Sequence, residues 1–255
     1  VHGSDGEKMS KSRGNVVEPL ATIKKYGADT LRLSLVSSAA PDKNINWDEK
    51  IVLGSHKFIR SIYNYFLKFR TGKTNPRSES KIHRVIKGVT EDVENFRHNL
   101  AVIKIRQIFQ YFQNNIPDKK NAENFLKMLH IYCPFITEEL WQKLGNKNFI
   151  SIEKWPKADE SKINIEFEKE EEIIEKTIND VNNVVKIIKD KGKSANKLYL
   201  YSIPTEKEIY INNLNEIEKR VGLKTEIFSV NDKNKHDPEK KSLKAKSGKP
   251  GIYLE

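Results

Sequence analysis

Lys8-Met9-Ser10-Lys11-Ser12, with Gly6 before it and Gly14 after it, is the stretch from which the rest of the chain can be interpreted. Two lysines, two serines and flanking glycines predict a short loop that is rich in hydrogen-bond donors. Backbone N–H groups and hydroxyls can surround a phosphate group, while ammonium groups reach its oxygens as point charges. Loops of this composition also occur as solvated turns on protein surfaces, so the composition alone leaves both interpretations open.

The residues after this loop make the interpretation more specific. The sequence continues as Gly14-Asn15-Val16-Val17-Glu18-Pro19-Leu20 and later as Lys25-Tyr26-Gly27-Ala28-Asp29-Thr30-Leu31-Arg32. In this order, the loop and the two segments resemble the KMSKS signature and the segment that follows it in class I aminoacyl-tRNA synthetases. The resemblance implies the end of a class I catalytic domain, which uses ATP, accompanied by Mg²⁺, to activate an amino acid.

The resemblance also implies a role for each residue of the loop. In this family the amino-acid carboxylate attacks the α-phosphorus of ATP, and negative charge accumulates on the departing pyrophosphate, where preorganised cations lower the barrier. Lys11 would make the main catalytic contact with the pyrophosphate, and Lys8 would assist it. The other ATP-binding residues that the family implies are Met9 near the adenine, and Ser10 and Ser12 at the phosphate oxygens.

The composition narrows the classes of protein to which the chain can belong. The 255 residues include 46 Lys and Arg against 35 Asp and Glu, a formal net charge of +11. Such an excess attracts polyanions, with nucleic acid as the leading candidate, although a lysine-rich proteome produces part of it without that role. The single cysteine, Cys133, excludes an intrachain disulfide and a cysteine-based zinc site. No apolar run reaches the roughly 18 residues of a membrane span, so we expect a cytoplasmic protein with no membrane partner.

Apolar residues at helical spacing dominate the middle of the chain. After short helices over 19–25 and from Ala28 to just before Pro41, they predict longer helices over about 48–70, 81–95, 98–114, 121–131 and 134–144. Gly, Pro and Ser interrupt the pattern over 72–80. Together these helices predict an antiparallel bundle.

Within this region, Leu129-His130-Ile131-Tyr132-Cys133-Pro134-Phe135-Ile136-Thr137-Glu138-Glu139-Leu140-Trp141 resembles a phrase of the anticodon-binding-type domain of the leucine, valine and isoleucine members of the family. Glu138 and Glu139 are adjacent on a helix and point in different directions. We therefore expect them to stabilise the helix start through its dipole, and not to act as an acid–base pair. His130 and Cys133 lack a second pair of ligands, so we expect core packing and no metal site.

The pattern changes after residue 157. A helical segment over 166–189 is followed by two alternating segments, 197–203 and 224–230, with a further helical segment between them. This order predicts a small α/β domain. Together with the C-terminal Gly248-Lys249-Pro250-Gly251-Ile252-Tyr253-Leu254-Glu255, it resembles the C-terminal domain of archaeal-type leucyl-tRNA synthetases, except that Lys249 and Gly251 replace the commoner Arg and Ala.

The resemblance to the leucine family implies that this domain binds tRNA(Leu) outside the anticodon, at its long variable arm. Seven lysines and three acidic residues lie between Asp232 and Lys249, which suits salt-sensitive phosphate contacts that position RNA without reading its bases. The expected contacts are Lys235, Lys240, Lys241, Lys244, Lys246 and Lys249; a solvated tail is the alternative. Tyr199, Tyr201 and Tyr253 have the chemistry to stack on a base, but tyrosines at strand positions are more often core residues.

We therefore expect a mainly α protein in three parts: a KMSKS loop and linker over 1–46, an antiparallel bundle of the anticodon-binding type over 47–157, and a small α/β tRNA-binding domain over 158–255. The resemblance implies leucine–tRNA ligase chemistry, in which ATP and leucine form leucyl-adenylate and the leucyl group passes to tRNA(Leu). Because the chain begins at Val1 inside the approach to the loop, we expect a missing N-terminal catalytic half, in the same or a separate chain, and no activity from this part alone. Two alternatives stay open: a valyl- or isoleucyl-tRNA synthetase fragment, and a non-catalytic tRNA-binding module derived from a synthetase.

Overall fold

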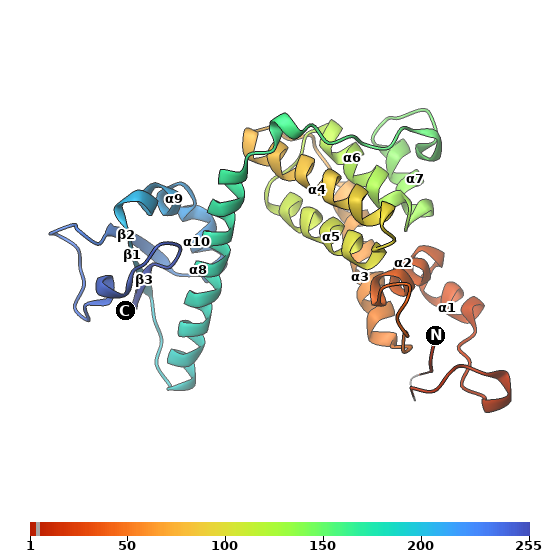
Figure 1. Ribbon diagram of the computed structural model, residues 1–255, viewed down its shortest axis with the longest axis horizontal. Helices are drawn as coiled ribbons and strands as arrows, with labels where there is room; N and C mark the ends of the chain where they lie inside the picture. The colour runs from red at the N-terminus through yellow and green to blue at the C-terminus, as the bar shows by residue number, and fades with distance from the viewer. Residues whose placement is uncertain (4–5) are drawn as a thin grey trace. The chain divides into compact units, whose positions relative to one another are not determined.

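The structure is a computed structural model that describes residues 1–3 and 6–255 (Figure 1). By their internal contacts, these residues form two compact units, Val1–Asn164 and Ile165–Glu255. Among the described residues, no helix is long and apolar enough to cross a membrane. The domain boundaries expected at residues 46 and 157 stay predictions.

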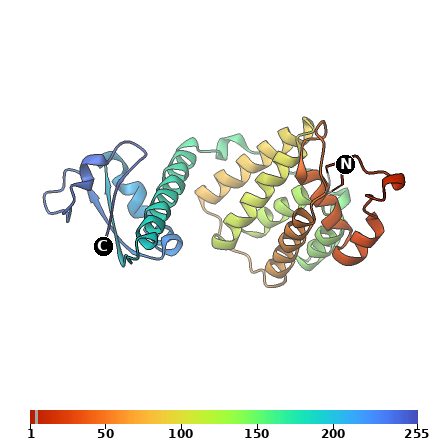
Figure 2. The same ribbon diagram turned by 90° about the horizontal axis from the view of Figure 1, so that it is seen from below.

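The first unit is helical. Its α-helices are α1 (Pro19–Tyr26), α2 (Ala28–Ser38), α3 (Glu49–Leu67), α4 (Pro76–Glu94), α5 (His98–Asn114), α6 (Lys119–His130) and α7 (Pro134–Lys143). Short 3₁₀ helices are η1 (Lys11–Arg13), η2 (Ile150–Ile152) and η3 (Glu160–Lys162). Joined by a short connection, α4 and α5 lie side by side in both views (Figures 1 and 2), so they run antiparallel. The antiparallel bundle predicted from the apolar spacing is confirmed.

Aromatic side chains fill the centre of this bundle. The ring of Phe125 on α6 stacks on Phe66 of α3 at a centroid distance of 6.0 Å and on Phe109 of α5 at 5.6 Å. Phe112 meets the same ring edge-on at 5.9 Å. Burying such large apolar rings is the main favourable contribution to folding, and their offset and edge-to-face arrangements add to it.

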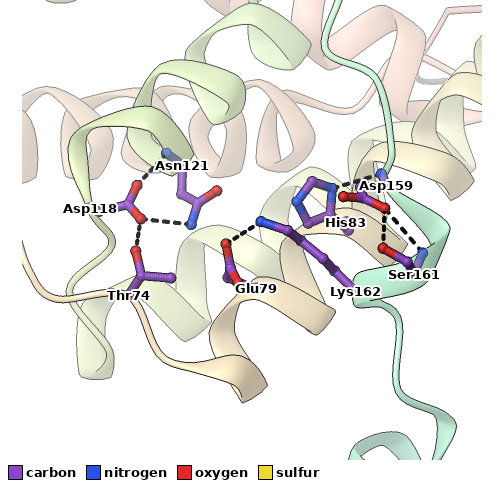
Figure 3. A network of polar contacts seen from close by, with 8 residues as sticks. All are labelled: Thr74, Glu79, His83, Asp118, Asn121, Asp159, Ser161 and Lys162. Carbon is purple, nitrogen blue, oxygen red and sulfur yellow. Dashed lines mark hydrogen bonds and ion pairs between the residues drawn. The ribbon is translucent and has the colours of Figure 1, made fainter.

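Side-chain caps begin α4 and α6 earlier than the apolar pattern indicates. The pattern predicts a helix from Lys81, but the side chain of Asn75 accepts a hydrogen bond from the N–H of Ser78 at 2.8 Å, and Pro76 takes the first helical position. Both features favour a helix start. Asp118 caps α6 in the same way and also accepts a hydrogen bond from the Thr74 hydroxyl (Figure 3).

Two side chains of α2 join that helix to the turn between α6 and α7. Asp29 accepts hydrogen bonds from the backbone N–H groups of Ile136 at 2.8 Å and Phe135 at 3.4 Å, so it caps the start of α7. Arg32 donates to the backbone carbonyl oxygens of Ile131 at 3.0 Å and Tyr132 at 3.3 Å, near the end of α6. These contacts give Arg32 a structural role through carbonyl groups.

The two adjacent glutamates of α7 do not cap its N-terminus. Glu138 accepts a hydrogen bond from the N–H of Ile150 at 3.1 Å. Glu139 accepts one from the hydroxyl of Tyr63 at 3.1 Å and pairs with Lys143 at 3.7 Å. The expected dipole stabilisation by these carboxylates stays a prediction, and the hydrogen-bonded cap of α7 comes from Asp29 of α2.

A polar network fastens the end of the first unit to α4 (Figure 3). The N–H of Asp159 donates to Nδ1 of His83 at 3.0 Å, and the ammonium group of Lys162 pairs with Glu79 at 2.7 Å. The Asp159 carboxylate in turn accepts a hydrogen bond from the hydroxyl of Ser161 at 2.6 Å. Because His83 and Glu79 lie more than 70 residues before their partners, these two contacts fix a segment that has little regular secondary structure.

The second unit combines helices with a small sheet. It contains α8 (Ile165–Asp190), β1 (Lys197–Ser202), η4 (Pro204–Glu206), α9 (Lys207–Asn212), α10 (Leu214–Val221), β2 (Lys224–Ser229), η5 (Lys241–Lys244) and β3 (Gly251–Leu254). The strand order is β2-β1-β3, with β1 parallel to β2 and antiparallel to β3. The mainly helical fold class with a small α/β domain is thus confirmed.

Alternation along the strands gives the sheet two different faces. Leu198 and Leu200 of β1 belong to an apolar cluster that also contains Ile174, Ile178 and Val181 of α8, which packs on this face (Figure 1). Tyr199 and Tyr201 alternate with these leucines and therefore lie on the opposite face. Both tyrosines are buried, as their strand positions predict.

The segment after β2 covers part of the tyrosine face. The Tyr201 hydroxyl donates to the backbone carbonyl of His236. At Gly251, an added Cβ would lie 2.2 Å from the carbonyl oxygen of Lys241 and 3.3 Å from the Tyr201 ring. Only glycine permits so close an approach of backbone to strand. The glycine at position 251 thereby has a physical explanation in this chain.

Candidate phosphate-binding loop and nucleic-acid interface

Backbone pairing anchors the base of the loop that carries Lys8 and Lys11. His2 forms isolated bridges with Lys8 and Asn46. Its N–H donates to the carbonyl of Ile45 at 2.7 Å, and its carbonyl accepts from the N–H of Trp47 at 2.9 Å. The loop therefore begins from a fixed position next to the start of α3.

Hydrogen bonds within the loop shape its tip. The side-chain oxygen of Asn15 accepts from the N–H of Ser10 at 2.9 Å, and its amide nitrogen lies 3.4 Å from the carbonyl of Lys8. The hydroxyls of Ser10 and Ser12 are 2.8 Å apart. η1 then ends at Gly14, whose φ of 68° favours glycine.

Lys8 and Lys11 differ from Arg13, the other cation of the loop, in their ion pairing. Arg13 forms an ion pair with Glu7 at 2.7 Å. Lys8 and Lys11 are exposed, and neither ammonium group has an ion-pair partner within the described part of the chain. Met9 is half-buried. Hydrated ammonium groups on a short loop can therefore turn toward an anionic ligand without breaking an ion pair to a described residue.

The six lysines predicted to contact RNA lie in the second unit and fall into two groups. Lys235 donates to the backbone carbonyl of Asp232 at 3.1 Å, and Lys241 pairs with Glu239 at 3.0 Å. The others are exposed and, over residues 1–3 and 6–255, make no ion pair: Lys240, Lys244, Lys246 and Lys249. Two of the six ammonium groups therefore have internal partners, and four face solvent.

A buried carboxylate holds Lys246 and Lys249 on either side of a tight turn. The two lysines pair through their backbones, with N–H to carbonyl distances of 2.8 and 2.9 Å. Glu206, with 7% of its surface exposed, accepts from the hydroxyl of Ser247 at 2.8 Å and from the N–H of Gly248 at 2.9 Å. Sequence reasoning missed Glu206, since nothing around a lone glutamate after Pro-Thr marks it as the support of a turn 41 residues away.

His130 and Cys133 lie in the packed first unit. Cys133 is fully buried, and burial raises the pKa of its thiol. Nδ1 of His130 lies 2.7 Å from the Thr137 hydroxyl, and burial lowers the pKa of its imidazole. Core packing is confirmed for Cys133. A search of the described residues finds no group of three or more His, Cys, Asp or Glu side chains that could hold a metal ion.

Two family models match parts of the sequence. Residues 1–48 match the family "tRNA synthetases class I (I, L, M and V)", and residues 78–200 match "Anticodon-binding domain of tRNA ligase". The first match contains the loop with Lys8 and Lys11. The second covers α4 to α7 and continues through α8 into β1.

A curated relative and a solved structure narrow the comparison. The chain is 35% identical over 178 residues to the leucine–tRNA ligase of Fervidobacterium nodosum. That alignment covers 61% of this chain and 22% of the ligase. In structure it is similar to Agrobacterium radiobacter K84 agnB2 LeuRS in a crystallised ternary complex with tRNA and LeuAMS. That match has a TM-score of 0.55 and 17% identity, and it covers 89% of this chain and 31% of the other.

These matches indicate the class: residues 1–48 are similar to class I tRNA synthetases, and residues 78–200 to the anticodon-binding domain of tRNA ligases. Within this class, it is a homologue of leucine–tRNA ligase. It spans about a fifth of the length of that curated relative. The valine and isoleucine alternatives are not favoured.

Proposed function

We propose that this chain is the C-terminal portion of a leucine–tRNA ligase, an enzyme that forms leucyl-adenylate from leucine and ATP and transfers the leucyl group to tRNA(Leu). The observation that carries the proposal is the exposed Lys8 and Lys11 pair on an anchored loop, in a chain homologous to leucine–tRNA ligase. Its place of work would be the cytoplasm.

The loop would act on the departing pyrophosphate. As leucine attacks the α-phosphorus, charge grows on the β- and γ-phosphates, and the ammonium group of Lys11 would stabilise it, with Lys8 assisting. Ser10 and Ser12 would donate their hydroxyls to phosphate oxygens, and Met9 would lie near the adenine. Mg²⁺ would arrive with ATP, as a partner of its phosphates.

The remaining half of the nucleotide-binding domain would complete this site. It would supply the leucine pocket and the HIGH motif, either earlier in the same chain or from a separate chain. On this proposal, residues 1–255 alone bind tRNA but do not activate leucine.

The second unit would hold tRNA(Leu) through phosphate contacts. The exposed ammonium groups of Lys240, Lys244, Lys246 and Lys249 supply this attraction, and Lys235 and Lys241 shape the same segment. Such contacts release counterions, so affinity should fall steeply as salt rises. The basic balance of the segment supports this role.

The test is leucine-dependent ATP–pyrophosphate exchange by the complete enzyme carrying Lys11→Ala. Loss of a contact made in the transition state should lower kcat by about 10²- to 10³-fold with tRNA affinity nearly unchanged. The matched control is Lys24→Ala, an exposed lysine on α1 outside the loop, which should leave exchange unchanged.

Two results would overturn the proposal in different ways. Exchange that depends on valine or isoleucine would replace leucine as the substrate. Exchange that is unaffected by Lys11→Ala and Lys8→Ala, together with tRNA binding that is insensitive to ATP, would favour a non-catalytic tRNA-binding module.

A further inference from the structure

The face of the sheet opposite α8 carries a cluster of aromatic rings. Tyr199 lies at its centre with 4% of its surface exposed. Its ring centroid is 4.9 Å from His236, 5.7 Å from Tyr253 and 6.4 Å from Phe228. The centre of the cluster is therefore a core residue, as its strand position predicts.

The rings around Tyr199 remain accessible. The His236 side chain is 48% exposed, and Tyr253 and Phe228 are half-buried. His236 and Tyr253 are tilted by 52° with centroids 6.0 Å apart, so a flat ligand can stack on one ring while the other borders it. Both rings rest on Tyr199, which limits the side-chain freedom that a ligand would otherwise have to remove.

Charged groups of both signs border the rings. The ammonium group of Lys197 lies 4.8 Å from the Tyr199 ring centroid and neutralises Glu226 at 2.6 Å. Glu255 accepts a hydrogen bond from the Tyr199 hydroxyl at 2.8 Å. Lys235, next to His236 in sequence, belongs to the segment with seven lysines and three acidic residues. The Glu255 carboxylate also lies 3.9 Å from Nε2 of His236, so the attraction for phosphates comes from the lysines of the basic segment that adjoins the rings.

We propose that His236 and Tyr253 form a stacking site for an unpaired nucleobase of RNA, while the neighbouring lysines hold the phosphates on either side of that base. This rests on the proposed function, because it specifies how the second unit contacts RNA. Aromatic rings stack on any base, and the energy does not depend on reading hydrogen-bond donors and acceptors. The site therefore selects single-stranded over paired nucleotides and adds an interaction that salt does not screen.

The experiment uses the full chain and a short single-stranded RNA that carries one 2-aminopurine. Stacking should quench the fluorescence of 2-aminopurine when the wild-type chain binds. Tyr253→Leu keeps an apolar side chain against Tyr199 but removes the aromatic ring, and His236→Ala removes the second ring. Each substitution should abolish most of the quench and weaken binding by about 5- to 100-fold, the range for loss of one stacked base.

Two controls separate stacking from charge and from folding. Tyr253→Phe should retain the quench, since the ring remains. Leu243→Ala changes a side chain in the same segment that is 81% exposed but not aromatic, and it should alter neither quench nor affinity. In all these variants the slope of log affinity against log salt should equal that of wild type, because no phosphate contact is lost.

The results distinguish this inference from the proposed function. RNA binding with normal salt dependence, but with a quench that survives in both Tyr253→Leu and His236→Ala, would overturn the stacking site and leave the phosphate contacts standing. If the wild-type chain bound neither the short RNA nor tRNA(Leu), both the stacking site and the tRNA-binding part of the proposed function would be overturned.

Discussion

The Asp29 carboxylate accepts the backbone N–H of Ile136 at 2.8 Å, although 107 residues separate them. Asp29 belongs to the segment that resembles the end of a class I catalytic domain, and Ile136 lies in the first turn of α7 in the bundle. Asp29 thus joins the linker that follows the loop of Lys8 and Lys11 to the helices of the bundle. Burial raises the pKa of the Asp29 carboxyl because it disfavours the charged form, while the two backbone N–H groups that it accepts oppose this effect.

Substitution of Asp29 should destabilise the first unit. We expect Asp29→Ala to lower its free energy of unfolding by about 1–2 kcal/mol, since the first N–H groups of α7 lose their acceptor. Asp29→Asn should cost less, because its amide oxygen still accepts. All three tryptophans, Trp47, Trp141 and Trp155, lie in this unit, so urea unfolding followed by tryptophan fluorescence measures the change. Equal effects of the two substitutions would contradict the capping role.

The stability of this unit should depend on pH in part through His83. Nδ1 accepts the N–H of Asp159, so the neutral ring carries its proton on Nε2, and burial lowers the pKa of the imidazole. A histidine whose folded pKa lies below its unfolded value of about 6.5 contributes stability above that pH and loses it as the pH falls. We expect the urea midpoint to decrease between about pH 7 and 5.5, and less so in His83→Gln. Identical pH profiles for the two proteins would refute this assignment.

The buried carboxylate of Asp92 should contribute more to the free energy of unfolding than a surface ion pair does. Its side chain, 3% exposed, pairs with Arg97 at 3.0 Å and with Lys104. Both cations are partly exposed and can rehydrate, so Asp92→Asn should lower the free energy of unfolding by about 1–3 kcal/mol. Glu160→Gln, which removes the exposed partner of Lys87, should give no measurable change. A comparable loss from both substitutions would argue against the role of burial.

Glu206 should influence RNA binding through the turn that it supports. In Glu206→Ala, the turn between Lys246 and Lys249 loses two hydrogen bonds, and these lysines lose their fixed positions. On the proposed function, the slope of log affinity for tRNA(Leu) against log salt should become shallower by about 1–2, equivalent to one or two phosphate contacts. The double variant Lys246→Ala/Lys249→Ala supplies the reference slope. A Glu206→Ala protein that is less stable but keeps the wild-type slope would show that Glu206 serves folding alone.

The sequence predicts the helices and strands well because their apolar periodicity is local. It also predicts the loop from Lys8 to Ser12, whose residues are contiguous. It does not predict contacts between residues far apart in the chain. Asp29 caps a helix that Glu138 and Glu139 were expected to stabilise, and Glu206 supports a turn 41 residues away. Asn75 escapes periodicity for a different reason: its contact with the N–H of Ser78 is local, but a polar cap is not part of the apolar pattern that marks the helix.

Gly251 sets the clearance between the sheet and the backbone of Lys241. A methyl group at this position would collide with the carbonyl oxygen of Lys241, so η5 could not pack so close to β3. The missing side chain at position 251 is therefore a condition for the packing of η5 against the end strand of the sheet.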